Sequence, residues 1–326
     1  MASTDLVRAF RAGDVRALAR AISLVERRDP SVRHLFEALD PDDAPPDVIG
    51  FTGAPGTGKS TLVDAATSHL RARGARVAVI AVDPNSPYSG GAILGDRIRM
   101  QRHSGDAGVY IRSMGARGHL GGLTVAAREV VRLLGAHGFD VVMLETVGVG
   151  QSELEVAAVA DTTVVVLTPG LGDGVQMIKA GILEIADLFV VNKADLAGAQ
   201  RTMQELRTML NMGPKLPWKP PIVATVADRG EGVPELFEHV ARHRRHLEST
   251  GEAERRARSR LRDEVADLVG EWARDQARSV LERDPALAAR LAEDRMPYAI
   301  AEEILTRDGA ELVPDAARGD GDIMDA

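Results

Sequence analysis

Residues 53–60 combine glycines, a lysine and a serine at the spacing of a phosphate-binding loop. Gly53 and Gly58 enclose four residues and precede Lys59 and Ser60, which is the pattern G-x-x-x-x-G-K-[ST]. Small residues let backbone N–H groups close on a phosphate chain, and the helix that follows directs its positive end at the anion. We expect Lys59 to reach the β- and γ-phosphates and the Ser60 hydroxyl to bind Mg²⁺. The nucleotide-binding residues predicted here are Gly53, Ala54, Pro55, Gly56, Thr57, Gly58, Lys59, Ser60 and Thr61.

A glycine turn between a strand and a helix would be the simpler interpretation of this loop. The full pattern, however, follows the apolar residues 48–52 and precedes a helical stretch, residues 61–73. This is the context that the motif requires, so we interpret the stretch as a P-loop.

A second motif, Asn192-Lys193-Ala194-Asp195, follows the apolar residues 188–191. It lies at the carboxyl end of an expected strand, where open α/β sheets bind ligands. The Asp195 carboxylate can accept from N1–H and the 2-amino group of guanine, whereas adenine offers no such donor pair. N-K-x-D alone is a common accident, but after a P-loop it predicts a preference for GTP over ATP. The loop expected to hold guanine O6 through backbone N–H groups, where a surface turn would look the same, is Val226, Ala227 and Asp228.

Acidic residues end or follow the expected strands near the P-loop. Hard oxygen ligands are those that Mg²⁺ prefers, often through its own waters. For any single carboxylate a solvated strand end is the alternative. The predicted metal ligands are Ser60, Asp83, Asp96 and Glu145.

Residues 145–148 read E-x-x-G, where most GTPases have D-x-x-G. A hydrogen bond from the Gly148 N–H to the γ-phosphate would make residues 147–153 a switch that relaxes after hydrolysis. No glutamine directly follows Gly148 to orient the attacking water, and Gln151 comes three residues later. We therefore expect slow hydrolysis until a partner completes the site.

The elements that must position these motifs alternate along the chain. Apolar runs and helical stretches follow one another from residue 48, which predicts an α/β fold with a mainly parallel P-loop NTPase sheet flanked by helices. Helical N- and C-terminal extensions enclose it, so the expected domains are residues 1–47, 48–240 and 241–326. The expected strands are residues 48–52, 77–82, 109–112, 140–145, 163–168, 188–192 and 221–226.

Composition narrows the class of protein. The 326 residues carry a net charge of −8, which argues against a general nucleic-acid binder, because neutralising phosphates needs a surplus of Lys and Arg. Cysteine is absent, so disulfides and thiolate metal sites are excluded. The first thirty residues hold no apolar stretch of signal-peptide or membrane length. We expect a cytoplasmic protein that binds neither nucleic acid nor membrane.

Together the motifs resemble the methylmalonyl-CoA mutase-associated GTPases of the MeaB/ArgK type, which are SIMIBI-class P-loop G proteins. The resemblance spans residues 48–240, and its most specific part is E-T-V-G-V-G-Q-S-E at 145–153. It implies a GTPase chaperone that gates cofactor loading of an adenosylcobalamin-dependent acyl-CoA mutase, methylmalonyl-CoA mutase first among them, and protects it against inactivation. It also implies a homodimer through the C-terminal helices, where Leu261, Val265, Leu268, Val269 and Trp272 form one stripe.

The same resemblance implies a third switch, which in the family commonly reads G-D-E-L-Q-x-I-K. In residues 172–179, Asp173, Gln176 and Lys179 match this pattern, but Gly174 replaces the acidic residue. That departure leaves open any contact between chains that the missing carboxylate would make. The catalytic residues expected from motifs and resemblance together are Lys59, Glu145, Gly148, Asp173 and Lys179.

The rival interpretation is a P-loop metallochaperone or another nucleotide-driven delivery protein. A nickel-delivering GTPase would normally add a His-rich tract or Cys/His ligands. The histidines that cluster here are His239, His243 and His246, at helical spacing among arginines. We interpret them as a solvated helix face, with a metal site as the less favoured alternative.

Overall fold

The computed structural model describes residues 2–39, 45–83, 101–103, 105–115, 122–146, 152–170, 183–213, 217–294 and 297–306. The chain divides into two compact units, Met1–Arg258 and Ser259–Ala326. The motifs discussed above all fall in the first unit, so this unit contains the predicted nucleotide site.

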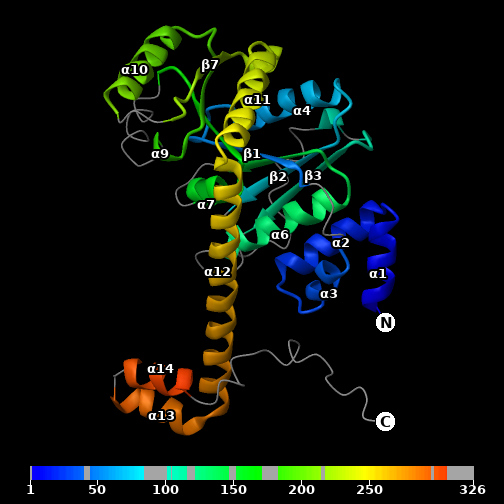
Figure 1. The fold of residues 1–326 in the computed structure, drawn as a ribbon, viewed down its shortest axis with the longest axis vertical. Helices are drawn as coiled ribbons and strands as arrows, with labels where there is room; N and C mark the ends of the chain where they lie inside the picture. Colours follow the sequence, from blue (N-terminus) through cyan, green and yellow to red (C-terminus); the bar gives the residue numbers. More distant parts are fainter. Residues whose placement is uncertain are drawn as a thin grey trace. The chain divides into compact units, whose positions relative to one another are not determined.

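A seven-stranded sheet forms the centre of the first unit (Figure 1). Its strand order is β3-β2-β4-β1-β5-β6-β7, and every neighbouring pair is parallel. The parallel sheet and its expected strands are thereby confirmed. The strands are β1 Asp47–Thr52, β2 Val77–Asp83, β3 Val109–Gly115, β4 Val141–Thr146, β5 Thr162–Leu167, β6 Leu188–Asn192 and β7 Ile222–Thr225.

Helices cover both faces of the sheet. Successive strand residues point to opposite sides, and in the central strands the residues on both sides are apolar, so both faces must be buried. On β2, Ala78 and Ile80 face the N-terminal helices and α6, whereas Val77 and Val79 face α4 and α11 (Figure 1). Helix α10 packs on β5 and β6 through Met203 and Leu206. Burial on both faces explains why the central strands read as continuous apolar runs.

The helices of the first unit begin with three in the N-terminal segment. Arg112 of β3 ties this segment to the sheet by donating to the Ala19 carbonyl at 2.8 Å and the Ser23 hydroxyl at 2.9 Å. The helices are α1 Ala2–Arg11, α2 Val15–Glu26, α3 Val32–Glu37, α4 Lys59–Arg71, α6 Gly122–Ala136, α7 Ser152–Val159, α9 Leu183–Ile185, α10 Ala199–Met212 and α11 Val233–Ser249, with 3₁₀ turns η1 Gln101–His103 and η3 Ala227–Arg229.

The described residues of the second unit form helices. Helix α12, Glu252–Arg283, begins in the first unit and continues into the second, which adds α13, Pro285–Asp294, and α14, Pro297–Thr306. Leu287, Ile300 and Ile304 form its small core.

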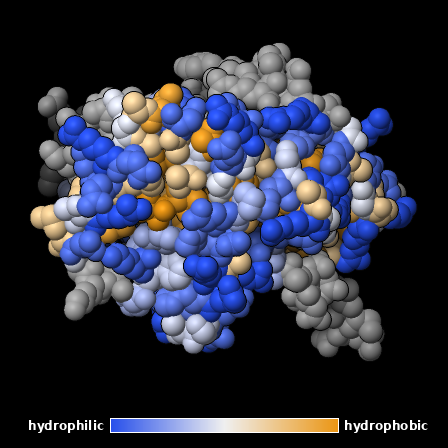
Figure 2. Space-filling view, turned by 90° about the horizontal axis from the view of Figure 1, so that it is seen from above, coloured by the Kyte–Doolittle hydropathy of each residue, from blue (hydrophilic) through white to orange (hydrophobic). Residues whose placement is uncertain are grey.

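Figure 2 shows a mainly hydrophilic face on which apolar side chains form small groups. Among the described helices, none is both long enough and apolar enough to cross a membrane.

Candidate functional site

The loop between β1 and α4 depends on glycine at two tight places. Gly53 has φ 142°, and a Cβ there would lie 2.2 Å from the Val166 carbonyl oxygen on the neighbouring strand β5. Gly58 has φ 87°, and a Cβ there would lie 2.4 Å from Nδ2 of Asn192. A side chain at either position would strain the backbone and collide with a neighbouring element. The glycines of the predicted P-loop are therefore needed to bring the loop against β5 and β6.

Lys59 opens helix α4 and is only 6% exposed. Its Nζ donates to the carbonyls of Gly53 at 2.6 Å and Ala54 at 3.0 Å, so the ammonium lies over the loop. Burial lowers the pKa of Lys59, while the Glu145 and Glu153 carboxylates act to raise it. The loop thus holds a desolvated positive charge beside the helix N-terminus, the arrangement that attracts a phosphate chain.

Glu145 lies near the carboxyl end of β4, between Phe51 of β1 and Ala81 of β2 in the strand register, and is 6% exposed. The Ser60 hydroxyl donates to its Oε1 at 2.5 Å. Two hard oxygen donors from different elements are thus in contact, and this donor set fits Mg²⁺. The two residues chosen from sequence lie together where the P-loop helix meets β4.

Glu153 stands in the first turn of α7 and is half-buried. Burial raises the pKa of Glu153 and the Lys59 charge lowers it, so this carboxylate lies within electrostatic reach of the P-loop ammonium. We predicted it only as the last residue of a switch. Its electrostatic interaction with Lys59 depends on the packing of α7 against the sheet.

Asn192 connects the base-reading end of the site to the P-loop. Its Nδ2 donates to the Thr57 carbonyl at 2.9 Å. Its Oδ1 accepts from the Thr225 hydroxyl at 3.0 Å and from the Ala227 N–H at 3.2 Å. The side chain is almost fully buried, and both its Nδ2 and its Oδ1 form hydrogen bonds. It links the loop after β6 to the P-loop and to the turn η3, and we call this link the Asn192 brace.

Lys193 and Asp195 extend from the same loop toward the surface. Lys193 has φ 55°, uncommon for a residue other than glycine, and its Nζ donates to the Gly56 carbonyl at 2.9 Å. Asp195 keeps 37% of its side chain exposed, and the Arg229 guanidinium lies 3.7 Å from it. The carboxylate is thus accessible for a base to reach.

The predicted guanine-O6 loop is the start of the 3₁₀ turn η3. The Val226 N–H donates to the Glu231 carbonyl at 3.1 Å, and the Ala227 N–H already has Asn192 as its acceptor. Amides in the first turn of a helix have no partner within that helix. Of the three residues predicted, Asp228 therefore has the backbone N–H best placed to donate a hydrogen bond to guanine O6.

Several predicted site residues lie partly or wholly outside the described part of the chain. Asp83 ends β2, one residue beyond the Val82–Thr146 pair, and only its backbone is described. The predicted residues outside the described part of the chain are Asp96, Gly148, Asp173 and Lys179.

The three clustered histidines do not form a solvated face as predicted. His243 is fully buried, and His239 retains only 20% exposure. Rings of His243 and His246 pack on Trp218 at centroid distances of 4.9 and 5.2 Å. Helical spacing and neighbouring arginines suggested solvent, but Trp218, 25 residues before His243, covers this face. Within the described residues no three His, Asp or Glu side chains are grouped to hold a metal ion.

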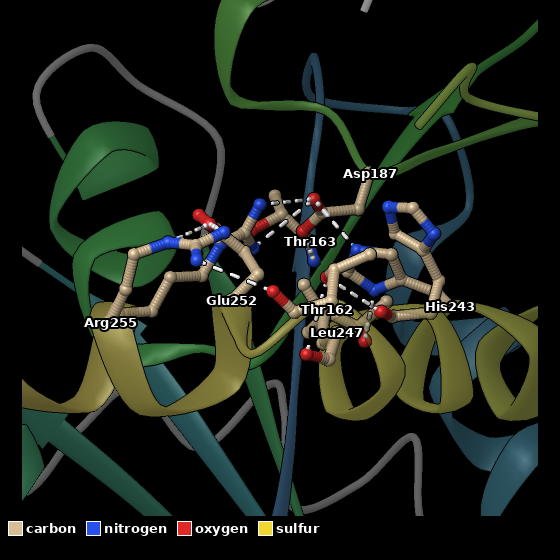
Figure 3. Close-up of polar contacts among 10 residues, drawn as sticks. Thr162, Thr163, Asp187, His243, Leu247, Glu252 and Arg255 are labelled. Atoms are coloured by element: carbon tan, nitrogen blue, oxygen red, sulfur yellow. Dashed lines mark hydrogen bonds and ion pairs between the residues drawn. The ribbon is translucent and has the colours of Figure 1, made fainter. Parts of the chain in front are cut away.

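His243 instead belongs to a polar cluster at the amino end of β5 (Figure 3). Its Nδ1 lies 2.9 Å from the Thr162 hydroxyl, and its Nε2 lies 3.2 Å from Asp187 without forming a hydrogen bond. Asp187 also accepts from the Thr163 N–H at 2.9 Å and lies 3.3 Å from Arg256 of α12. Thr162, His243 and Asp187 are buried at the edge of the sheet opposite the P-loop, so we interpret this set as a structural connection between α11, α12 and the sheet.

The β1–loop–α4 unit, the Asn192 brace and the exposed Asp195 define a P-loop nucleotide-binding protein with a guanine-recognition motif. Residues 18–281 match the family described as "Methylmalonyl Co-A mutase-associated GTPase MeaB". The chain belongs to this family of P-loop GTPases.

Relatives support this assignment across most of the chain. A protein of Pyrococcus horikoshii is 45% identical over 308 residues, which are 93% of this chain and 97% of that protein. The Escherichia coli protein named GTPase ArgK is 38% identical over 283 residues, 83% of this chain and 82% of its own. The Caenorhabditis elegans protein named methylmalonic aciduria type A homolog, mitochondrial, is 35% identical over 303 residues, 87% of this chain and 75% of its own.

A solved structure agrees in fold. The crystal structure of a LAO/AO transport system kinase superposes with a TM-score of 0.68 at 27% identity, covering 93% of this chain and 98% of that chain. The family and the parallel P-loop fold expected from the motifs are confirmed.

Proposed function

We propose that the protein binds GTP and GDP with Mg²⁺, hydrolyses GTP slowly by itself, and acts as a chaperone for an adenosylcobalamin-dependent acyl-CoA mutase. The observation that carries the nucleotide part is the Asn192 brace, which joins the P-loop at Thr57 to the guanine-recognition loop at Ala227. One side chain thereby holds the phosphate-binding and base-reading parts in a fixed relation, as a single nucleotide requires.

In this site the residues of the chain mainly position charge. Lys59 moves from the Gly53 and Ala54 carbonyls to the phosphates, which neutralises them and satisfies its ammonium. Ser60 and Glu145 would hold Mg²⁺, which would supply further charge neutralisation. Asp195 accepts from the guanine edge. Gly148 belongs to the proposed catalytic residues as well, and Asp173 and Lys179 join them when the mutase binds.

The nucleotide part is tested by calorimetry with GTP, GDP and ATP. GTP and GDP should bind and ATP should not, because adenine lacks the donor pair that Asp195 accepts. Asp195→Asn should shift the preference toward xanthine nucleotides, since the amide donates where the carboxylate accepted. Equal affinity of the native protein for ATP and GTP would exclude this assignment.

The partner part is supported by the family description, which names methylmalonyl-CoA mutase, and by the name of the Caenorhabditis elegans relative. The chaperone would gate cofactor loading and protect the mutase from inactivation. Its first test is capture from a cell extract with the protein bound to a non-hydrolysable GTP analogue, where a cobalamin-dependent mutase should co-purify.

A kinetic test examines the proposed third switch. Single-turnover GTP hydrolysis should accelerate when the mutase is added, and Lys179→Ala should lose most of that acceleration while keeping the basal rate. Linkage applies to binding: if the mutase changes the affinity for GTP or for GDP, that nucleotide must change the affinity for the mutase by the same factor. Full stimulation of Lys179→Ala would assign the coupling to residues 147–153 instead.

We further propose that the protein is a homodimer through the stripe on α12. Leu261, Val265, Val269 and Trp272 are 45–60% exposed although they are large and apolar. Their spacing of three and four residues places them on one helix face, and such a face favours burial against a second helix.

A further inference from the structure

Arg229 stands between two carboxylates at the base-reading end of the site. Its Nη2 lies 3.7 Å from Oδ2 of Asp195, and its Nη1 lies 3.9 Å from Oε1 of Glu231. All three side chains are partly exposed, at 58% for Arg229, 37% for Asp195 and 61% for Glu231. The guanidinium thus lies within ion-pair distance of two carboxylates at once, and one of them is the carboxylate proposed to read guanine.

The backbone that carries Arg229 is held firmly. Val226 and Glu231 form a two-bond bridge, with N–O distances of 3.1 and 3.3 Å, around the turn η3. Gly232, at φ 77°, closes the turn where a Cβ would lie 2.1 Å from the Ala224 carbonyl oxygen. Because the bridge and the Asn192–Ala227 bond fix the turn to β6 and β7, exchange of partners requires only side-chain rotation of Arg229.

The chemistry of guanine makes the two partners of Asp195 compete. The N1–H and 2-amino groups need both carboxylate oxygens as acceptors, in a bidentate arrangement. An arginine is itself a fork of donors that suits the same carboxylate. We propose that Arg229 is shared between Asp195 and Glu231 without nucleotide and keeps only Glu231 when guanine binds, so that it competes with the base and promotes nucleotide release. This inference rests on the proposed GTP and GDP binding and adds a residue that sets its lifetime.

The expected effect of removing Arg229 on GDP binding is small because the ion-pairing side chains are partly exposed. Ion pairs between exposed side chains contribute little, so Arg229→Ala should slow GDP release and tighten GDP binding by only about two- to fivefold. GTP should gain by the same factor, because Arg229 acts at the base and not at the γ-phosphate. The gain should shrink in 1 M salt, where charges beyond about 3 Å are screened.

The measurement is displacement of a fluorescent GDP analogue from the full-length protein. Arg8→Ala is the matched control, since Arg8 lies 3.6 Å from Asp5 in an exposed pair on α1 and its loss changes the net charge equally. Arg8→Ala should leave release unchanged. Faster or unaltered release from Arg229→Ala would overturn the proposal, faster release indicating that Arg229 supports the base.

Glu231→Gln should change GDP binding in the opposite direction, and it tests whether Glu231 acts through Arg229. Without the second carboxylate, Arg229 should remain on Asp195, so GDP should bind more weakly and leave faster than in the native protein. In the double variant that combines Arg229→Ala with Glu231→Gln, the effect of Glu231→Gln on GDP release should vanish, because no arginine is left to pair with Asp195. A Glu231→Gln effect that persists in the double variant would also overturn the exchange.

Comparison with ADP separates the two levels of inference. A native protein that did not prefer GDP to ADP would refute the proposed nucleotide function and the exchange together. Clear preference for GDP combined with native release rates in Arg229→Ala would refute only the exchange.

Discussion

The side-chain amide of Asn192 donates a 2.9 Å hydrogen bond to the main-chain carbonyl of Thr57, 135 residues earlier in the chain. This bond joins the end of β6 to the P-loop. Both groups are buried, so each depends on the other to satisfy its hydrogen-bonding capacity. The P-loop and the loop that follows β6 are therefore directly connected.

Removing this side chain should weaken both folding and nucleotide binding. Asn192→Ala leaves the Thr57 carbonyl and the Thr225 hydroxyl without their partner, which should cost about 1–3 kcal/mol of unfolding free energy. Asn192→Asp keeps the acceptor for Thr225 and Ala227 but places a buried carboxylate oxygen against the Thr57 carbonyl, so its loss of stability should be at least as large as that of Asn192→Ala. Urea unfolding of the empty protein and GDP calorimetry measure the two effects, and native stability of Asn192→Ala would contradict the brace.

Two glycines of the P-loop offer a controlled comparison. Gly56 and Gly58 have φ of 80° and 87°, so alanine at either carries a backbone cost of about 1–2 kcal/mol. A Cβ at Gly56 meets nothing within 4 Å, whereas at Gly58 it would lie 2.4 Å from Asn192. Gly58→Ala should therefore displace the brace and lose much more GDP affinity than Gly56→Ala. Similar losses for the two variants in calorimetry would show that backbone strain alone decides.

Much of this fold could be predicted from sequence because strands buried on both faces are written as uninterrupted apolar runs. Residues 141–144 and 188–191 are examples, and both lie in strands of the sheet. The P-loop could be predicted equally well from the sequence, because Gly53, Gly58 and Lys59 must occupy fixed spacings to close on a phosphate chain.

The missed features depend on contacts between distant parts of the chain. Arg229 reaches Asp195 only because β6 and β7 are neighbours, and Glu153 reaches Lys59 only because α7 packs on β1 and β4. His243 was assigned to solvent because its neighbours in sequence are arginines, yet Trp218 and Asp187 enclose it. Local periodicity reports which face a residue occupies, but tertiary packing decides what covers that face.

The Ser60–Glu145 contact predicts how two kinds of variant differ. Glu145→Gln keeps the size and the contact with Ser60 but removes the charge, so the Mg²⁺ concentration for half-maximal GTP hydrolysis should rise about ten- to a hundredfold. GDP affinity measured in EDTA should change little. Lys59→Ala should show the reverse, with nucleotide affinity lost even in EDTA. Native Mg²⁺ dependence in Glu145→Gln would return Glu145 to the role of a buried strand-end carboxylate.

Acid stability should depend on Asp106. Hydrogen bonds from Arg71 and from the Gly108 N–H lower the pKa of Asp106 to about 2, from an ordinary value of 3.8. A carboxyl with a depressed folded pKa stabilises the fold above its ordinary pKa, and this contribution is lost as pH falls from about 4 toward 2. Asp106→Asn should thus be less stable than the native protein at pH 6 and lose less stability on acidification.

Urea unfolding at several pH values checks the Asp106 prediction. Asp5→Asn, on the exposed helix α1, is the control and should follow the native pH profile. Parallel profiles for native protein and Asp106→Asn would contradict the role assigned to the Arg71 pair.

The apolar stripe on α12 leads to a prediction about assembly. Val265 is 60% exposed in the single chain, and in the proposed homodimer it would be buried against the partner helix. Val265→Asp would then place a carboxylate without a partner in an apolar contact, which costs several kcal/mol and should convert the dimer to monomer.

Val15→Asp is the matched control, because Val15 is 50% exposed on α2, in the other unit. Sedimentation equilibrium should find dimers for the native chain and Val15→Asp and monomers for Val265→Asp. GDP affinity should be equal in all three, since the residues proposed to bind the nucleotide all belong to the first unit. A native monomer, or dimers that persist in Val265→Asp, would remove the stripe as the dimer contact.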